Sequence, residues 1–212
     1  MSTIGILTVS LIYLFSRASC QVTRTLGNSN DVCMRIAKDP YFDIDLVVGE
    51  PWRIYYSWNM NLETKCLDLV IRNATQEIIK RIWTDMSEYL EQQPYWEAAT
   101  LHMSMGSPSH ELLLFAAQGA AGTFLAVPNV VRNSNIKPMR KGVPLLKFQM
   151  KLIRNGKYLL MMDCHVGAST LSARVGSSYR TEIAAEAAAL NLGDGHPACV
   201  NEKKDDEQFF LN

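Results

Sequence analysis

The sequence has no excess of charge of either sign. Its 212 residues carry 21 Lys and Arg side chains against 21 Asp and Glu side chains, so the formal net charge is zero. A nucleic-acid-binding surface needs a basic excess, because neutralising phosphates supplies much of the affinity. The one basic cluster, residues 137–141, has no interleaved aromatic side chains and is typical of a solvated loop. We therefore expect no nucleic-acid partner.

The sequence also lacks the motifs of common enzyme classes. It contains no Gly-x-Ser-x-Gly elbow, phosphate-binding loop, His-Glu-x-x-His pair or closely spaced cysteine pair. Cys164 and His165 are adjacent, but neighbouring residues of a strand point to opposite faces, so they cannot act together as nucleophile and base. The cysteines and histidines are too scattered to favour a metal site. We predict no enzyme, no catalytic residue, no metal and no cofactor.

Apolar runs of membrane-spanning length are missing. The run Ile4–Phe15 is too short to cross a bilayer comfortably as a helix. Small residues at Ala18 and Cys20 suit a signal peptidase, so we place cleavage before Gln21. Residues 1–20 are thus predicted to be a signal peptide, which implies a secreted, extracellular protein with no membrane span.

The remaining chain has the length of one domain. About 190 residues can bury a sizeable core, and no shift in composition marks a second unit. We assign residues 21–200 to this domain. Residues 201–212 form a tail of mixed charge, for which we expect no ordered structure.

Cysteine is scarce, and its count is informative. The sequence has five cysteines, and removal of the signal peptide takes away Cys20. The four that remain, Cys33, Cys66, Cys164 and Cys199, form an even set in an exported chain, which indicates two disulfides. Three pairings are possible, and the spacing does not choose between them.

Alternation of apolar and polar residues indicates antiparallel strands. The clearest case is Leu146, Phe148, Met150 and Leu152 against intervening polar residues. The Asn-Gly pair in residues 154–157 then predicts a tight hairpin into the next apolar run. Similar alternation occurs at residues 67–72 and 99–105.

Helical signals are fewer. The alanine-rich segment Thr181–Asn191 predicts one helix, with Thr181 or Ser178 as its cap and Gly193 as its left-handed stop. Residues 78–90 fit either an amphipathic helix or a strand. Residues 119–144 are read mostly as loop, with one strand near 123–127. Many strands and one late helix predict an all-β barrel or sandwich, which the pattern alone does not separate.

The chain resembles the lipocalin family, and in particular its insect bilin-binding members. Gly49-Glu50-Pro51-Trp52 is similar to the family's Gly-x-Trp signature, with one extra residue. The segment 155–164 resembles its second signature, around strand G. The order of the four cysteines is also similar: one before strand A, one at the start of strand B, one in strand G and one after the helix.

The resemblance implies an eight-stranded antiparallel up-and-down barrel with one C-terminal helix. It implies the disulfides Cys33–Cys164 and Cys66–Cys199, and a barrel floor closed by Trp52. In the family, an arginine of the last strand packs over that tryptophan; Arg174 and Arg180 are both candidates. Residues 106–141 exceed the family's usual length and could contact a protein partner.

The resemblance further implies a carrier that binds a small apolar ligand, such as a pigment, retinoid or fatty acid, inside the barrel. An eight-stranded barrel is wide enough for one small ligand, although the same side chains could simply fill the core. The alternatives are a secreted interaction protein, such as a protease inhibitor or structural secretory component, with a filled barrel, and an enzyme on the same scaffold. The candidate ligand-binding residues are Tyr56, Trp58, Leu69, Ile71, Leu101, Met103, Phe148, Met150 and Met161.

Asn73-Ala74-Thr75 forms an acceptor triplet for N-glycosylation at the end of a predicted strand. Because the triplet falls near a turn of a chain predicted to be exported, we expect Asn73 to carry a glycan.

These assignments predict the mature N-terminus. Mass spectrometry of protein collected from the medium of secreting cells should give a chain that begins at Gln21 and lacks Cys20. A chain that retains residues 1–20 would contradict the signal peptide.

Overall fold

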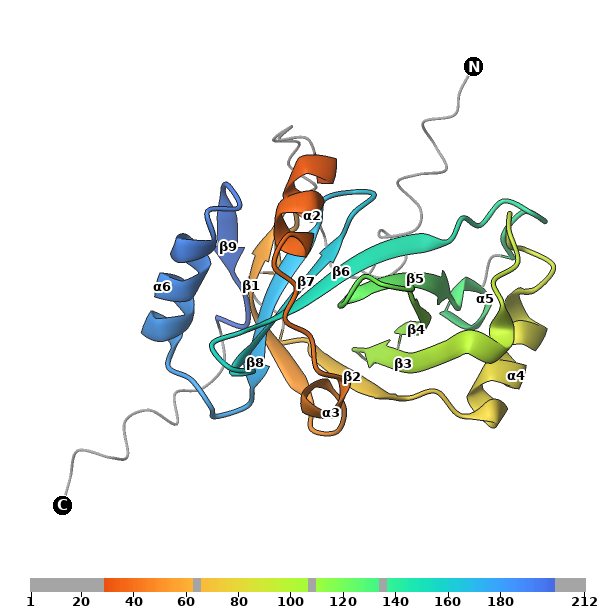
Figure 1. The fold of residues 1–212 in the computed structure, drawn as a ribbon, viewed down its shortest axis with the longest axis horizontal. Coiled ribbons are helices and arrows are strands. Elements are labelled where there is room, and N and C mark those ends of the chain that lie inside the picture. The colour runs from red at the N-terminus through yellow and green to blue at the C-terminus, as the bar shows by residue number, and fades with distance from the viewer. Residues whose placement is uncertain (1–28, 63–65, 107–109, 134–136, 201–212) are drawn as a thin grey trace.

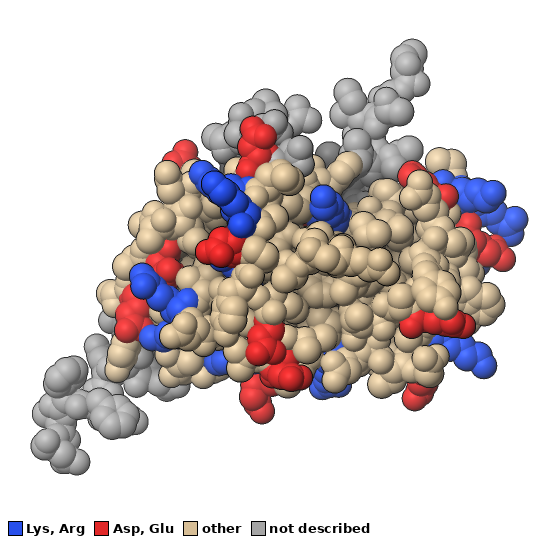
Figure 2. All heavy atoms as spheres, in the orientation of Figure 1, with Lys and Arg blue, Asp and Glu red and all other residues tan. Residues whose placement is uncertain are grey.

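The structure is a computed structural model that describes residues 29–62, 66–106, 110–133 and 137–200. The predicted signal peptide and the charged tail lie outside the described residues. Among the described helices, none is both long and apolar enough to cross a membrane. Basic and acidic side chains are interspersed over the face shown in Figure 2, in keeping with the balanced composition.

Eight antiparallel strands form a closed up-and-down barrel (Figure 1). Each strand pairs with the next along the chain, and β1 pairs with both β2 and β8, which closes the ring. This confirms the predicted barrel and excludes the sandwich. The strands are β1 (Trp52–Trp58), β2 (Asp68–Asn73), β3 (Ala99–Met105), β4 (His110–Ala116), β5 (Thr123–Pro128), β6 (Leu146–Ile153), β7 (Tyr158–Asp163) and β8 (Ser169–Arg174).

Much of the barrel wall is covered on both sides, which is why several strands read as continuous apolar runs. In β7, Leu159 and Met161 join the interior cluster, whereas Tyr158, Leu160 and Met162 face a second cluster outside the barrel. The helix α6 (Arg180–Leu190) packs on that outer face through Ile183 and Ala187. A short strand, β9 (Gly195–Pro197), pairs antiparallel with the second half of β1, from Tyr56 to Trp58.

Both ends of α6 differ from those predicted from the sequence. The N-cap residue is Tyr179, not Thr181 or Ser178, and its backbone N–H donates to Glu182 Oε2 at 3.3 Å. The helix ends at Asn191, whose φ of 48° is left-handed, rather than at Gly193. Asparagine tolerates this conformation, because its short polar side chain can bond locally.

Residues 78–90 are mainly helical. The helix α4 (Gln76–Met86) is capped by the Thr75 hydroxyl, which accepts from the Ile78 N–H at 3.3 Å. Its apolar residues pack with Leu113 and Val127 in a third cluster, on the outer face of β4 and β5. The short helix α5 (Val130–Asn133) contacts α4, so the region predicted as loop also contains a helix. A single 3₁₀ turn, η1 (Trp96–Ala98), leads into β3.

Both disulfides have the pairing that the resemblance implied. Cys33 of α2 (Ser29–Ala37) is bonded to Cys164, and Cys66 is bonded to Cys199. Cys164 follows β7 directly and Cys66 precedes β2, so both lie just outside the strands in which the family places them. The bridges join positions 131 and 133 residues apart, and such long loops give large constraints on the unfolded chain.

Trp52 closes one end of the barrel. Its side chain is fully buried, and its indole Nε1 donates to the Val47 carbonyl of α3 (Ile44–Val47) at 2.9 Å. The Arg174 guanidinium carbon lies 3.9 Å from the Trp52 ring centroid, and Nη2 donates to the Leu46 carbonyl at 2.8 Å. Arg174 is therefore the arginine over the tryptophan. Arg180 lies outside, near Tyr55.

Replacement of Trp52 tests this floor. Trp52→Ala should lower the free energy of unfolding by about 3–5 kcal/mol, because a buried cavity replaces the indole. Trp83→Ala is the matched control: Trp83 is 48% exposed on α4, and its loss should change stability by no more than about 0.5 kcal/mol. Urea unfolding measures both. Equal losses in the two variants would remove Trp52 from this role.

Candidate functional site

The candidate site is the interior of the barrel. A continuous cluster of buried apolar side chains fills it from the Trp52 floor to the opposite end. Seven of the nine predicted ligand-binding residues belong to this interior cluster: Leu69, Ile71, Leu101, Met103, Phe148, Met150 and Met161.

Tyr56 and Trp58 are not in the interior, so that part of the prediction is wrong. The pairing of β1 with β8 advances from Ile54–Ser172 to Tyr56–Leu171, which places a β-bulge at Tyr55. The extra residue reverses the alternation of faces along β1. Tyr56 and Trp58 therefore pack outside, in the second cluster.

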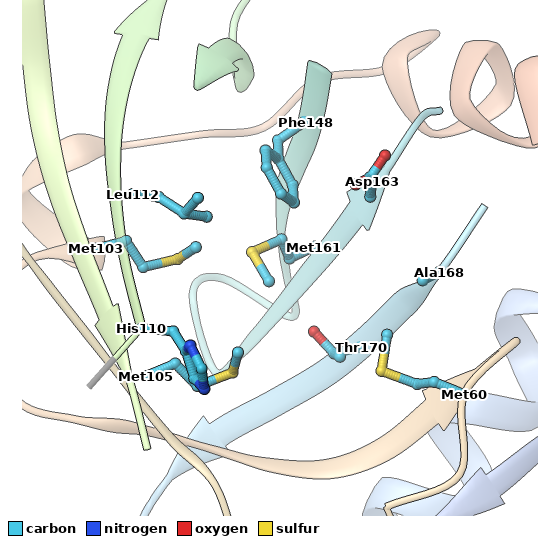
Figure 3. A pocket seen from close by; sticks show the side chains of 10 residues that line it. All are labelled: Met60, Met103, Met105, His110, Leu112, Phe148, Met161, Asp163, Ala168 and Thr170. Carbon is cyan, nitrogen blue, oxygen red and sulfur yellow. The ribbon is translucent and has the colours of Figure 1, made fainter. Parts of the chain in front are cut away.

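A small void remains inside the barrel, at the end remote from Trp52. It lies near the last residues of β7 and the first of β8, whereas Trp52 pairs with Arg174 at the far end of β8. Figure 3 shows Met103, Met161 and Thr170 directed toward a common space. The void is lined by Met60, Met103, Met105, His110, Leu112, Phe148, Met161, Asp163, Ala168 and Thr170.

The void is about 20 Å³, which is room for one water molecule. Four of its ten lining side chains are methionines. Methionine is unbranched and has three rotatable side-chain bonds, so it can fill a space in one rotamer and vacate it in another. The size of this space therefore depends on methionine rotamers.

A buried hydroxyl on β8 is one of the polar groups that line the void. Thr170 is 1% exposed, and its hydroxyl makes no hydrogen bond within the described residues. Ser172, two residues along β8 toward Trp52, is equally buried and its hydroxyl also lacks a partner there, but it does not line the void. A buried hydroxyl without a partner costs free energy, so Thr170 is the expected contact for a polar atom of a guest in the void.

Asp163 and His110 add titratable groups at the same end. Asp163 Oδ1 accepts from the backbone N–H of His165 at 2.8 Å and of Val166 at 3.3 Å, which orders the turn after β7. Burial raises the pKa of the Asp163 carboxyl above its ordinary value, although these two bonds oppose the shift. Burial lowers the pKa of the His110 imidazole, which favours its neutral form.

A second group of buried ionisable side chains lies outside the barrel, beneath α4. Glu111 accepts two hydrogen bonds from Arg81, at 2.7 and 3.0 Å, and its Oε1 lies 3.6 Å from His102 Nε2. Asn129 bonds to both Asp85 and Glu111. Because Arg81 and Asp85 belong to α4, these contacts hold the helix against the wall.

Sequence reasoning missed most of the polar lining. Met103, Phe148 and Met161 reach the void, while Leu69, Ile71, Leu101 and Met150 lie elsewhere in the interior. Met105 and His110 are placed together by the β3–β4 hairpin, in which they are paired. The sequence contains no signal for Thr170, because the apolar residues of β8, Leu171 and Ala173, face the outer cluster, whereas its inward positions are polar.

The remaining sequence predictions concern the surface. Asn73 ends β2 with an exposed side chain, a position open to modification. Residues 106–141 include β4, β5 and α5, so this region contributes two strands to the barrel wall.

Comparisons with known proteins give no match: no protein family, no curated protein and no solved structure is detectably similar to this chain.

The buried carboxyl predicts a dependence of stability on pH. A carboxyl whose native pKa is raised destabilises the fold as pH rises above the unfolded value, about 3.9, and the loss is complete above the native pKa. Asp163→Asn keeps an acceptor for the two N–H groups and removes this cost. We expect it to be more stable than wild type at pH 7, with a smaller gain at pH 4.

Asp163→Ala supplies the contrast, since it removes the acceptor as well as the charge. It should be less stable than Asp163→Asn at both pH values, by about 1–3 kcal/mol. Urea unfolding at the two pH values measures all three proteins. A gain for Asp163→Asn that does not change with pH would contradict a raised native pKa.

Proposed function

We propose that this protein is a secreted carrier, of the lipocalin type, that binds a small apolar ligand inside its barrel. The observation that supports this most directly is the void bounded by four methionines, with the unpartnered hydroxyl of Thr170 in its wall. An apolar space that ends at a free hydrogen-bonding group is the usual construction of a small-molecule site.

Binding proceeds by displacement of methionine side chains. A ligand enters at the end of the barrel remote from Trp52, where the void lies, and the methionines move to other rotamers around it. Burial of its apolar surface contributes about 25 cal/mol per Å², from which the costs of ordering are subtracted. A hydroxyl or carbonyl on the ligand would pair with Thr170 and remove the cost of its buried hydroxyl.

The two disulfides support export, because such bonds persist in oxidising compartments.

The second candidate is a secreted interaction protein whose barrel is a filled core. The observation in its favour is the volume of the void, about 20 Å³, which holds no organic ligand without rearrangement. In that case the outer surface, and not the interior, would carry the function.

Enlarging the void separates the two candidates. Met161→Ala removes a lining side chain of the void, whereas Met86→Ala removes a methionine of α4 that is buried outside the barrel. Each should lower stability by about 2–5 kcal/mol. Wild type should bind the neutral fluorophore N-phenyl-1-naphthylamine, Met161→Ala should bind it more tightly, and Met86→Ala should match wild type.

Fluorescence titration measures the three affinities. If neither wild type nor Met161→Ala binds the probe while both remain folded by circular dichroism, the carrier proposal fails and the interaction protein becomes the leading candidate.

A further inference from the structure

A second and larger cavity lies outside the barrel. Its volume is about 390 Å³, within the range of small-molecule sites. It is bounded by α2, the end of β1, the turn between β7 and β8, and the segment between α6 and β9 (Figure 1). Its lining residues are Val32, Arg35, Trp58, Asn59, Met162, Gly167, Ser169, Asn191, Leu192, Gly193 and Asp194.

The walls of this outer cavity are held in place independently of any ligand. The disulfide Cys33–Cys164 ties α2 to the end of β7. Arg35 Nη2 donates to the Asn191 carbonyl at 3.0 Å and so joins α2 to the end of α6. Asn59 Nδ2 donates to the Gly167 carbonyl at 2.8 Å. A cavity built in this way needs little ordering on binding, which favours affinity.

β9 completes the wall by close packing on aromatic rings. The Tyr56 and Trp58 ring centroids are 4.9 Å apart, and Tyr56 Oη donates to the Gly195 carbonyl at 3.1 Å. A side chain at Gly195 would come within 2.7 Å of both rings, so only glycine fits there. The segment before it, Asn191–Asp194, is thereby placed beside Trp58.

The outer cavity combines an apolar base with charges at its rim. Trp58 and Met162 are buried at the base, whereas Arg35 and Asp194 are exposed. The two charges have opposite sign, and within the described residues neither takes part in an ion pair. Asp194 would repel a purely anionic guest, and Arg35 would repel a purely cationic guest. A guest that carries both charges satisfies both.

We propose that the outer cavity is a second binding site, for a small zwitterion with an apolar side chain, such as a free aromatic or aliphatic amino acid. The carboxylate of the ligand pairs with the Arg35 guanidinium, which can present two N–H donors to it. Its ammonium group pairs with the Asp194 carboxylate, and its side chain packs on Trp58 and Met162. This site is independent of the barrel interior, so either can fail alone.

Calorimetric titration with L-phenylalanine tests the proposal. Wild type should bind it at millimolar or lower concentration, and should bind 3-phenylpropionate and 2-phenylethylamine more weakly, because each lacks one charge. Arg35→Gln and Asp194→Asn should each weaken the binding of L-phenylalanine about tenfold or more, which corresponds to about 1.4 kcal/mol. Arg35→Lys keeps the charge and should lose less than Arg35→Gln.

Arg140→Gln is the control, because Arg140 is an exposed arginine that pairs with Glu88, away from the outer cavity. It should bind as wild type does. Any of three results would overturn the proposal: no heat of binding with wild type; equal affinity for L-phenylalanine in wild type, Arg35→Gln and Asp194→Asn; or displacement of L-phenylalanine by N-phenyl-1-naphthylamine, which would place it inside the barrel.

Discussion

The β-bulge at Tyr55 in β1 is the constraint on which both cavities depend. Before it, Trp52 and Ile54 face inward; after it, Tyr56 and Trp58 face outward. Without the extra residue, strict alternation would point the Tyr56 and Trp58 rings into the interior. With it, the same rings form the base of the outer cavity and the surface on which β9 packs. Bulges are common where a side chain must be directed to another face, and this one divides a single strand between two sites.

The disulfides act together with the bulge. Each joins a terminal segment to the barrel across more than 130 residues: α2 through Cys33–Cys164, and the segment that follows β9 through Cys66–Cys199. Both segments cover the outer face of β1, β7 and β8 and give the outer cavity its walls. The helix α4, by contrast, is held by the ion pair between Arg81 and Glu111 and by packing on β4 and β5. The two sides of the barrel are therefore covered by different means.

The interior shows how an apolar core and a binding site can share residues. Methionines fill the space beside Thr170 and leave about 20 Å³. The buried hydroxyls of Thr170 and Ser172 are the feature that a simple core does not explain, because a core of this kind favours apolar or fully bonded groups. Their position on β8 places both on the inner face of the wall.

The sequence by itself determined the barrel strands with clear alternation, the late helix and the presence of two disulfides, because period-two patterns, alanine-rich runs and an even cysteine count are local signals. The resemblance to lipocalins added the pairing of the cysteines and the role of Trp52. Tertiary structure alone decided that Tyr56 and Trp58 face outward, because the bulge arises from the pairing of β1 with β8 and the sequence of β1 contains no signal for it. It also decided that residues 76–86 are a helix, whose apolar face is explained only by the wall beneath it. It decided that Arg174, and not Arg180, packs over Trp52. It also brought Arg35, Trp58 and Asp194 around one cavity, since residues far apart in the chain meet only when the barrel closes.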